Sequence, residues 1–149
     1  MLNAGAAGIF PETSKGCMNS KHIETIEQAA AQSIRGEISF GEVVGRLMAI
    51  GLERYHADYT RGESTFYFPD GSTHVVALPV PAKTIADVFS AAAVESAVRQ
   101  AQRGELKYAG FLEKTFDAGC VGYFVLIAGR CVQYFGRRGE THVENFPSK

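Results

Sequence analysis

The sequence predicts an α+β domain in which helices cover an antiparallel sheet made of two related α-β-β-β units. Hydrophobic periods of about 3.6 residues alternate with periods of two, and turn motifs separate the period-two segments. The same order of segments also occurs twice along the chain. With 149 residues, 46% hydrophobic and 21% charged, the chain is long enough for one domain with its own core.

The N-terminal part divides into a tail and a first helix. Residues 1–19 are rich in Gly, Ala and Ser and lack periodicity, which predicts a flexible tail before a single domain over 20–149. Apolar residues at helical spacing predict a helix over about 21–34, and Gly36 follows it.

A second helix follows from a capping motif. Ser39 and Glu42 have the spacing of a capping box, in which each side chain satisfies a backbone N–H at the helix start. The helix is therefore expected over about 40–50, with Gly51 as its terminator.

The rest of the chain contains two three-stranded meanders, because the hydrophobic period changes to two after each long helix. We expect strands at 55–59, 64–68, 72–78, 123–127, 131–135 and 141–145. Between the meanders, Ser90 caps a helix that ends at Gly104, and a short helical turn over 85–89 precedes it. A last helix is expected over about 107–118, ended by Gly119.

An internal repeat connects the two meanders. Shifting residues 40–79 by 68 positions onto 108–147 aligns seven identical residues without a gap. The identical pairs are Gly51/Gly119, Tyr55/Tyr123, Gly71/Gly139, Thr73/Thr141, His74/His142, Val75/Val143 and Pro79/Pro147. We expect residues 80–107 to connect the two units and residues 20–38 to form an additional helix.

The two units differ on the sheet face that points away from their helices. That face carries His56 and Asp58 in the first unit but Phe124 and Leu126 in the second. Leaving two large apolar side chains in water costs about 2 kcal/mol each. The N-terminal helix, the 90–103 helix or a second copy of the chain is therefore expected to cover them, so a homodimer is one expected outcome.

Three runs of sequence resemble a known family. They are GLERYHAD at 51–58, FYFPDG at 66–71 and AGCVGYFVLIAGRCVQYFGRRGETHVENFP at 118–147. They resemble the YbcV-like family of bacterial and phage proteins, often labelled "phage envelope protein", over about residues 20–147. This resemblance implies a small α+β domain without an established activity.

Charge and composition exclude several classes of partner. Lys and Arg number 15 and Asp and Glu 16, so the formal charge of −1 predicts neither nucleic acid nor an anionic membrane as partner. No stretch approaches the ~18 apolar residues of a membrane span, and the first basic residue is Lys15, so we expect a cytoplasmic protein. Cys17, Cys120 and Cys131 lack CxxC spacing and are expected to be reduced thiols.

Histidines and carboxylates form the first set of candidate ligand-binding residues. His56 and Asp58 share a strand face, where they form either a base with its orienting carboxylate or an ordinary polar surface. His74 and His142 are equivalent in the repeat and, if they met, would bind a metal with Glu144 and Asp58; otherwise they serve packing. No metal-binding motif is present, so no metal is expected.

Arginines form the second candidate set. Arg137 and Arg138 occupy one glycine-flanked turn and Arg130 the neighbouring one, an arrangement that predicts either a clamp for a phosphate or carboxylate, flanked by His142, or solvated turns.

Two classes of function follow from these residues. The first is a non-enzymatic interaction or accessory protein, because apolar surface is in excess and no catalytic motif occurs. The alternative is a small-molecule or anion-binding domain, an enzyme included, that uses His56, Asp58, Arg137 and His142. No nucleotide-binding motif occurs, so no cofactor is expected, and the ligand is left open.

Overall fold

The computed structural model describes residues 18–147 and confirms the α+β class. The helices within these residues are α2 (Ser20–Ile34), α3 (Phe40–Ala49), α4 (Ala91–Gln102) and α5 (Tyr108–Asp117). The strands are β1 (Arg54–Asp58), β2 (Glu63–Tyr67), β3 (Thr73–Ala77), β4 (Cys120–Leu126), β5 (Cys131–Gly136) and β6 (Thr141–Asn145). Most of the predicted tail, Cys17 included, lies outside the described residues.

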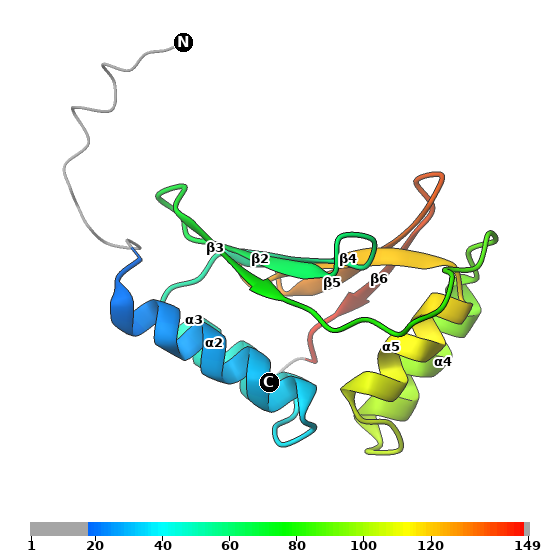
Figure 1. The fold of residues 1–149 in the computed structure, drawn as a ribbon, viewed down its shortest axis with the longest axis horizontal. Coiled ribbons are helices and arrows are strands. Elements are labelled where there is room, and N and C mark those ends of the chain that lie inside the picture. Colours follow the sequence, from blue (N-terminus) through cyan, green and yellow to red (C-terminus); the bar gives the residue numbers. More distant parts are fainter. Residues whose placement is uncertain (1–17, 148–149) are drawn as a thin grey trace, which may run out of the picture.

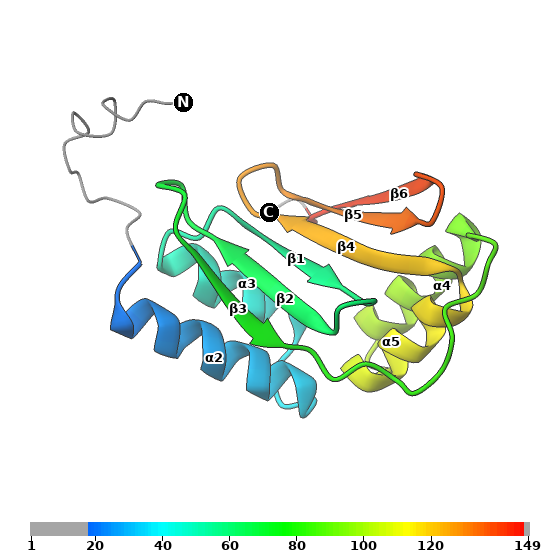
Figure 2. The ribbon, with the colours of Figure 1, turned by 45° about the horizontal axis from the view of Figure 1, so that its top comes forward.

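A single antiparallel sheet joins the two predicted units. Its strand order is β3-β2-β1-β4-β5-β6, so β1 and β4 form the centre and β3 and β6 the edges. All four helices lie on one face, with α2 and α3 beneath one half and α4 and α5 beneath the other (Figure 1 and Figure 2). We call this the helix face and the opposite side the open face.

The expected helix starts and stops are present. Ser39 Oγ accepts a hydrogen bond from the Glu42 backbone N–H at 3.2 Å, and the Glu42 carboxylate accepts one from the Ser39 N–H at 2.8 Å. After α3 and α5, Gly51 and Gly119 have φ values of 80° and 78°, the left-handed conformation that only glycine adopts without strain.

Two local predictions differ from the structure. The helical turn expected over 85–89 is absent, because the backbone there bonds to other elements: the Ala86 N–H donates to Phe116 O and the Ser90 N–H to Ala118 O. The fourth strand begins at Cys120, three residues earlier than expected, and its pairing with β5 is irregular between Cys120 and Gly122.

Alternating side chains of the strands build the core on the helix face. Tyr55, Ala57 and Tyr59 of the first half are all buried there, as their period of two predicts. The buried Tyr59 hydroxyl lies 2.8 Å from the hydroxyl of Thr115 on α5, so the core also links the two halves by a hydrogen bond.

The segments before the predicted units are also alike. Under the same shift of 68, Arg35-Gly36-Glu37 after α2 falls on Arg103-Gly104-Glu105 after α4. Each arginine pairs with its glutamate, at 2.8 Å and 2.7 Å, and the two glycines have φ values of 72° and 77°. The order α-α-β-β-β therefore occurs twice, one helix more than the sequence comparison included. The duplication itself stays a prediction.

The open face leaves Phe124 and Leu126 without a helix over them (Figure 1). The prediction that a helix of the same chain covers them is wrong, because α2 and α4 both pack against the helix face. Both side chains are half-buried by neighbours in the sheet, and Phe124 stacks on the imidazole of His56 at 4.4 Å. Covering by a second copy stays a prediction.

No helix within residues 18–147 has both the length and the apolar character needed to cross a membrane.

Candidate functional site

The three candidate arginines do not meet at one spot. Arg130 precedes β5 and Arg137 and Arg138 follow it, so the strand's six residues, at about 3.3 Å each, separate them by roughly 20 Å. The expected clamp is therefore wrong in its geometry.

Each of these arginines instead holds a piece of backbone. Arg137 donates to Ile85 O at 2.7 Å and Arg138 to Asp87 O at 3.2 Å, which fastens the loop between β3 and α4. Arg130 donates to Pro147 O at 3.3 Å.

His56 and Asp58 share the open face but not a site. Asp58 accepts hydrogen bonds from the backbone N–H groups of Thr60 and Arg61, both at 3.1 Å, so its carboxylate holds the turn after β1. Partial burial lowers the pKa of His56, and the charge of Asp58 only partly opposes that shift. A neutral imidazole stacked on Phe124 fits packing better than base catalysis.

The repeated histidines lie far apart. His74 is on the edge strand β3 and His142 on the opposite edge strand β6, five strand spacings or roughly 24 Å away. His74 hydrogen-bonds Glu27 of α2 at 2.8 Å. Within residues 18–147, no group of three His, Cys, Asp or Glu side chains could hold a metal ion.

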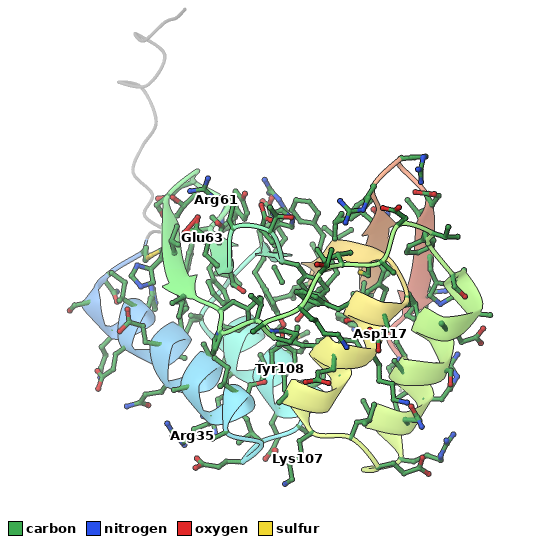
Figure 3. All side chains as sticks on the ribbon, turned by 45° about the vertical axis from the view of Figure 1, so that its right-hand side comes forward. Arg35, Arg61, Glu63, Lys107, Tyr108 and Asp117 are labelled. Carbon is green, nitrogen blue, oxygen red and sulfur yellow. The ribbon has the colours of Figure 1, made fainter. Side chains whose placement is uncertain are left out.

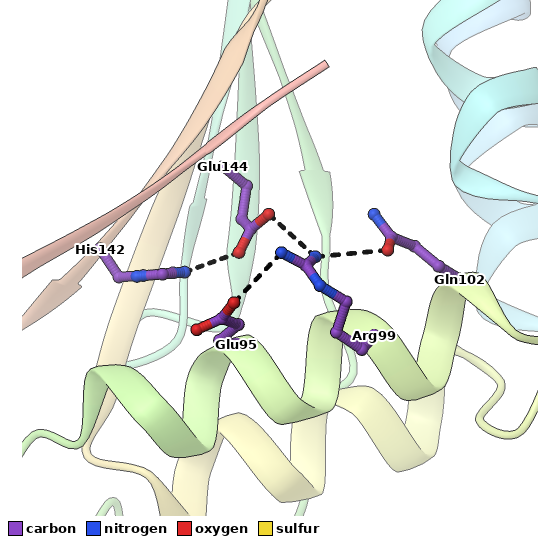
Figure 4. A network of polar contacts seen from close by, with 5 residues as sticks. All are labelled: Glu95, Arg99, Gln102, His142 and Glu144. Atoms are coloured by element: carbon purple, nitrogen blue, oxygen red, sulfur yellow. Dashed lines mark hydrogen bonds and ion pairs between the residues drawn. The ribbon is translucent and has the colours of Figure 1, made fainter. Parts of the chain in front are cut away.

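One pair of candidates does come together, His142 and Glu144 on the helix face of β6. His142 Nε2 lies 2.7 Å from Glu144 Oε2, and Arg99 of α4 donates to the other carboxylate oxygen at 3.0 Å. Arg99 also pairs with Glu95 at 3.3 Å (Figure 4). The Glu144 side chain is only 13% exposed, so this is a largely buried carboxylate held by two partners.

Glu144 belongs to the wall of a cleft that sequence reasoning missed. The cleft has a volume of about 610 Å³ and lies on the helix face, between the α2–α3 pair and the α4–α5 pair. We call it the helix-face cleft. Its lining includes Ala30, Ser33, Val43, Val98, Ala101, Tyr108 and Phe111 from the helices and Tyr55, Ser64, Phe66, Val76, Tyr123, Val132, Tyr134 and Glu144 from the strands.

Four tyrosines contribute hydroxyl groups to the lining of the cleft. Tyr108 lies beneath the sheet between the helix pairs (Figure 3), and its hydroxyl is 2.7 Å from that of Tyr123. The Tyr55 phenol also interacts with Tyr123. Burial raises the pKa of Tyr108 to about 12, so these phenols are neutral donors and acceptors at physiological pH.

The Tyr134 hydroxyl is the exception, because within residues 18–147 no group hydrogen-bonds it although the residue is only 6% exposed. A buried hydroxyl without a partner is costly unless water or a ligand satisfies it. The cleft thus combines a mainly apolar lining with a few polar atoms, as small-molecule sites do.

At one end of the cleft the loops after α2 and α4 meet. Lys107 Nζ donates to Gly36 O at 3.0 Å, and Lys107 and Arg35 lie at this same end of the molecule (Figure 3). This contact ties the two helix pairs together.

The chain belongs to the DUF1398 family of proteins of unknown function, whose pattern matches residues 28–145. The match covers every strand and all four helices except the start of α2. No curated protein is similar enough to the chain to be matched. The narrower YbcV-like assignment stays a prediction.

Proposed function

We propose that this protein binds a small, largely apolar molecule in the helix-face cleft. The observation that carries the proposal is the cleft of about 610 Å³ between the two helix pairs. Ligand sites have volumes of about 300–1,000 Å³ and place a few polar groups in an apolar lining. The Tyr134 hydroxyl, buried and without a partner among residues 18–147, adds a specific group for a ligand to satisfy.

Binding of the neutral fluorescent probe N-phenyl-1-naphthylamine tests this proposal. We expect enhanced fluorescence and a Kd of roughly 1–200 μM, from about 0.3–0.5 kcal/mol for each of the probe's heavy atoms. Ala101→Phe puts a ring into the cleft from α4 and is expected to weaken binding at least tenfold.

Ala92→Phe is the matched control, because Ala92 is exposed on the same helix and does not line the cleft. It should leave binding unchanged. Ala30→Phe repeats the test from α2, in case the first variant misfolds. A folded Ala101→Phe or Ala30→Phe protein that binds the probe as well as wild type contradicts the proposal.

A second function, association of two copies, is supported by the open face. Val75 and Val143 on the edge strands are 49% and 46% exposed there, each two strands away from the stacked His56 and Phe124 at the centre. Arg54 and Asp58 lie at opposite ends of β1 on this face, so a two-fold contact would place each arginine opposite the partner's aspartate. We propose that the open face forms a homodimer. The phage-related role and cytoplasmic location stay predictions.

A further inference from the structure

The two walls of the helix-face cleft differ in polarity at equivalent positions. Several residues related by the shift of 68 both line the cleft, and five such pairs have an apolar residue in the first half and a polar one in the second. These pairs are Ile34/Gln102, Phe40/Tyr108, Phe66/Tyr134, Val76/Glu144 and Ala77/Asn145. Among the lining pairs, two serines, Ser33 and Ser64, reverse the pattern, because Ala101 and Val132 stand at the equivalent positions. At equivalent positions the cleft is therefore more apolar on the side of α2 and β3 and more polar on the side of α4 and β6, and Glu37 after α2 adds one carboxylate to the first side.

The polar wall has free hydrogen-bonding capacity. Glu144 accepts one bond on each oxygen, from Arg99 and from His142, and a carboxylate oxygen has room for a second. The Tyr134 hydroxyl has no partner among residues 18–147. A ligand atom that donates to Glu144 and accepts from Tyr134 would satisfy both.

The charge of Glu144 determines which kind of polar head group a ligand can place against the polar side of the cleft. Arg99 and His142 hold Glu144 from positions that do not line the cleft, and Glu144 is the carboxylate of this network that does line it (Figure 4). The lining lysine, Lys107, is engaged with Gly36 O at one end. An anionic head beside Glu144 would meet a like charge where water is partly excluded.

We propose that the natural ligand is an amphiphile whose head is an N–H or O–H donor, an alcohol or amine rather than a carboxylate. Its head lies against Glu144 and Tyr134, and its apolar tail lies against Phe40, Phe66 and Val76. This inference rests on the proposed function and adds the class and orientation of the ligand.

Displacement of N-phenyl-1-naphthylamine by three ten-carbon chains tests the head group. At pH 7 we expect 1-decanol and decylamine to displace the probe at concentrations at least tenfold lower than decanoate. Probe binding itself reports the proposed function, so probe binding with equal displacement by decanoate and decanol overturns this inference alone.

Variants then test the residues. Glu144→Gln keeps the size of the side chain and is expected to reduce the preference for decanol over decanoate to less than threefold. Glu95→Gln removes the same charge from the Arg99 network but does not line the cleft, so it should keep the preference. Tyr134→Phe should weaken the binding of decanol more than the binding of the probe. If Glu144→Gln and Tyr134→Phe both keep the wild-type preference, the inference is wrong.

Discussion

Replacing Gly51 and Gly119 by alanine tests whether equivalent positions in the two halves have different surroundings. Both glycines end a helix in the left-handed conformation, with φ values of 80° and 78°, so each alanine costs about 1–2 kcal/mol of backbone strain. The alanine also lowers the conformational entropy of the unfolded chain, which stabilises the folded protein by about 0.4–1 kcal/mol. At Gly51 an added Cβ meets no atom within 4 Å, so the net loss of unfolding free energy should be about 1 kcal/mol or less.

At Gly119 the same Cβ would lie 2.3 Å from Val88 O, in the loop that crosses the end of α5. A backbone atom moves only with its loop, and overpacking of this kind costs about 1–3 kcal/mol more. Gly119→Ala should therefore lower the free energy of unfolding by about 2–4 kcal/mol. Urea unfolding followed by circular dichroism measures both variants, and equal losses at the two positions would show that the loop does not pack as described.

Three further predictions concern titration, association and the loop. Burial raises the pKa of Tyr108 to about 12, so the folded state holds this proton more tightly than the unfolded one; stability is full below about pH 10 and falls as pH rises toward 12. Alkaline melts of wild type and Tyr108→Phe check this, and the variant should lose less stability over that range. Phe124→Asp should convert the proposed open-face dimer to a monomer in light scattering, whereas a wild type that stays monomeric at every protein concentration measured contradicts the open-face contact. Arg137→Gln with Arg138→Gln should lower the unfolding free energy by about 1–2 kcal/mol, because both side chains hold the Ile85–Asp87 backbone; an unchanged melting temperature would count against that role.

Local chemistry made most of the secondary structure predictable. The capping box at Ser39 and the glycines after α3 and α5 each act through atoms a few residues away, so spacing alone locates them. The 85–89 loop was mispredicted because distant partners, the ends of α5 and the Arg137 guanidinium, take up its backbone groups.

The site was less predictable, because it depends on the distance between elements. The cleft depends on how far apart the two helix pairs lie beneath the sheet, and no local pattern encodes that separation. One signal was present in the sequence: the repeated Arg-Gly-Glu at 35–37 and 103–105 would have extended the repeat to all four helices. The separation of Arg130 from Arg137 also follows from strand length alone, and the expectation of a clamp overlooked it.

The placement of the equivalent strands β3 and β6 at opposite edges of the sheet bears on aggregation. Each edge has backbone groups that another chain could pair with, and pairing of one copy's β3 with the next copy's β6 would leave free edges at both ends, so the assembly would grow into a filament without closing. Both strands have only five residues, and Pro79 and Pro147, which lack an N–H, stand two residues beyond them. These short edge strands, followed by prolines, limit the number of backbone hydrogen bonds through which two copies can pair.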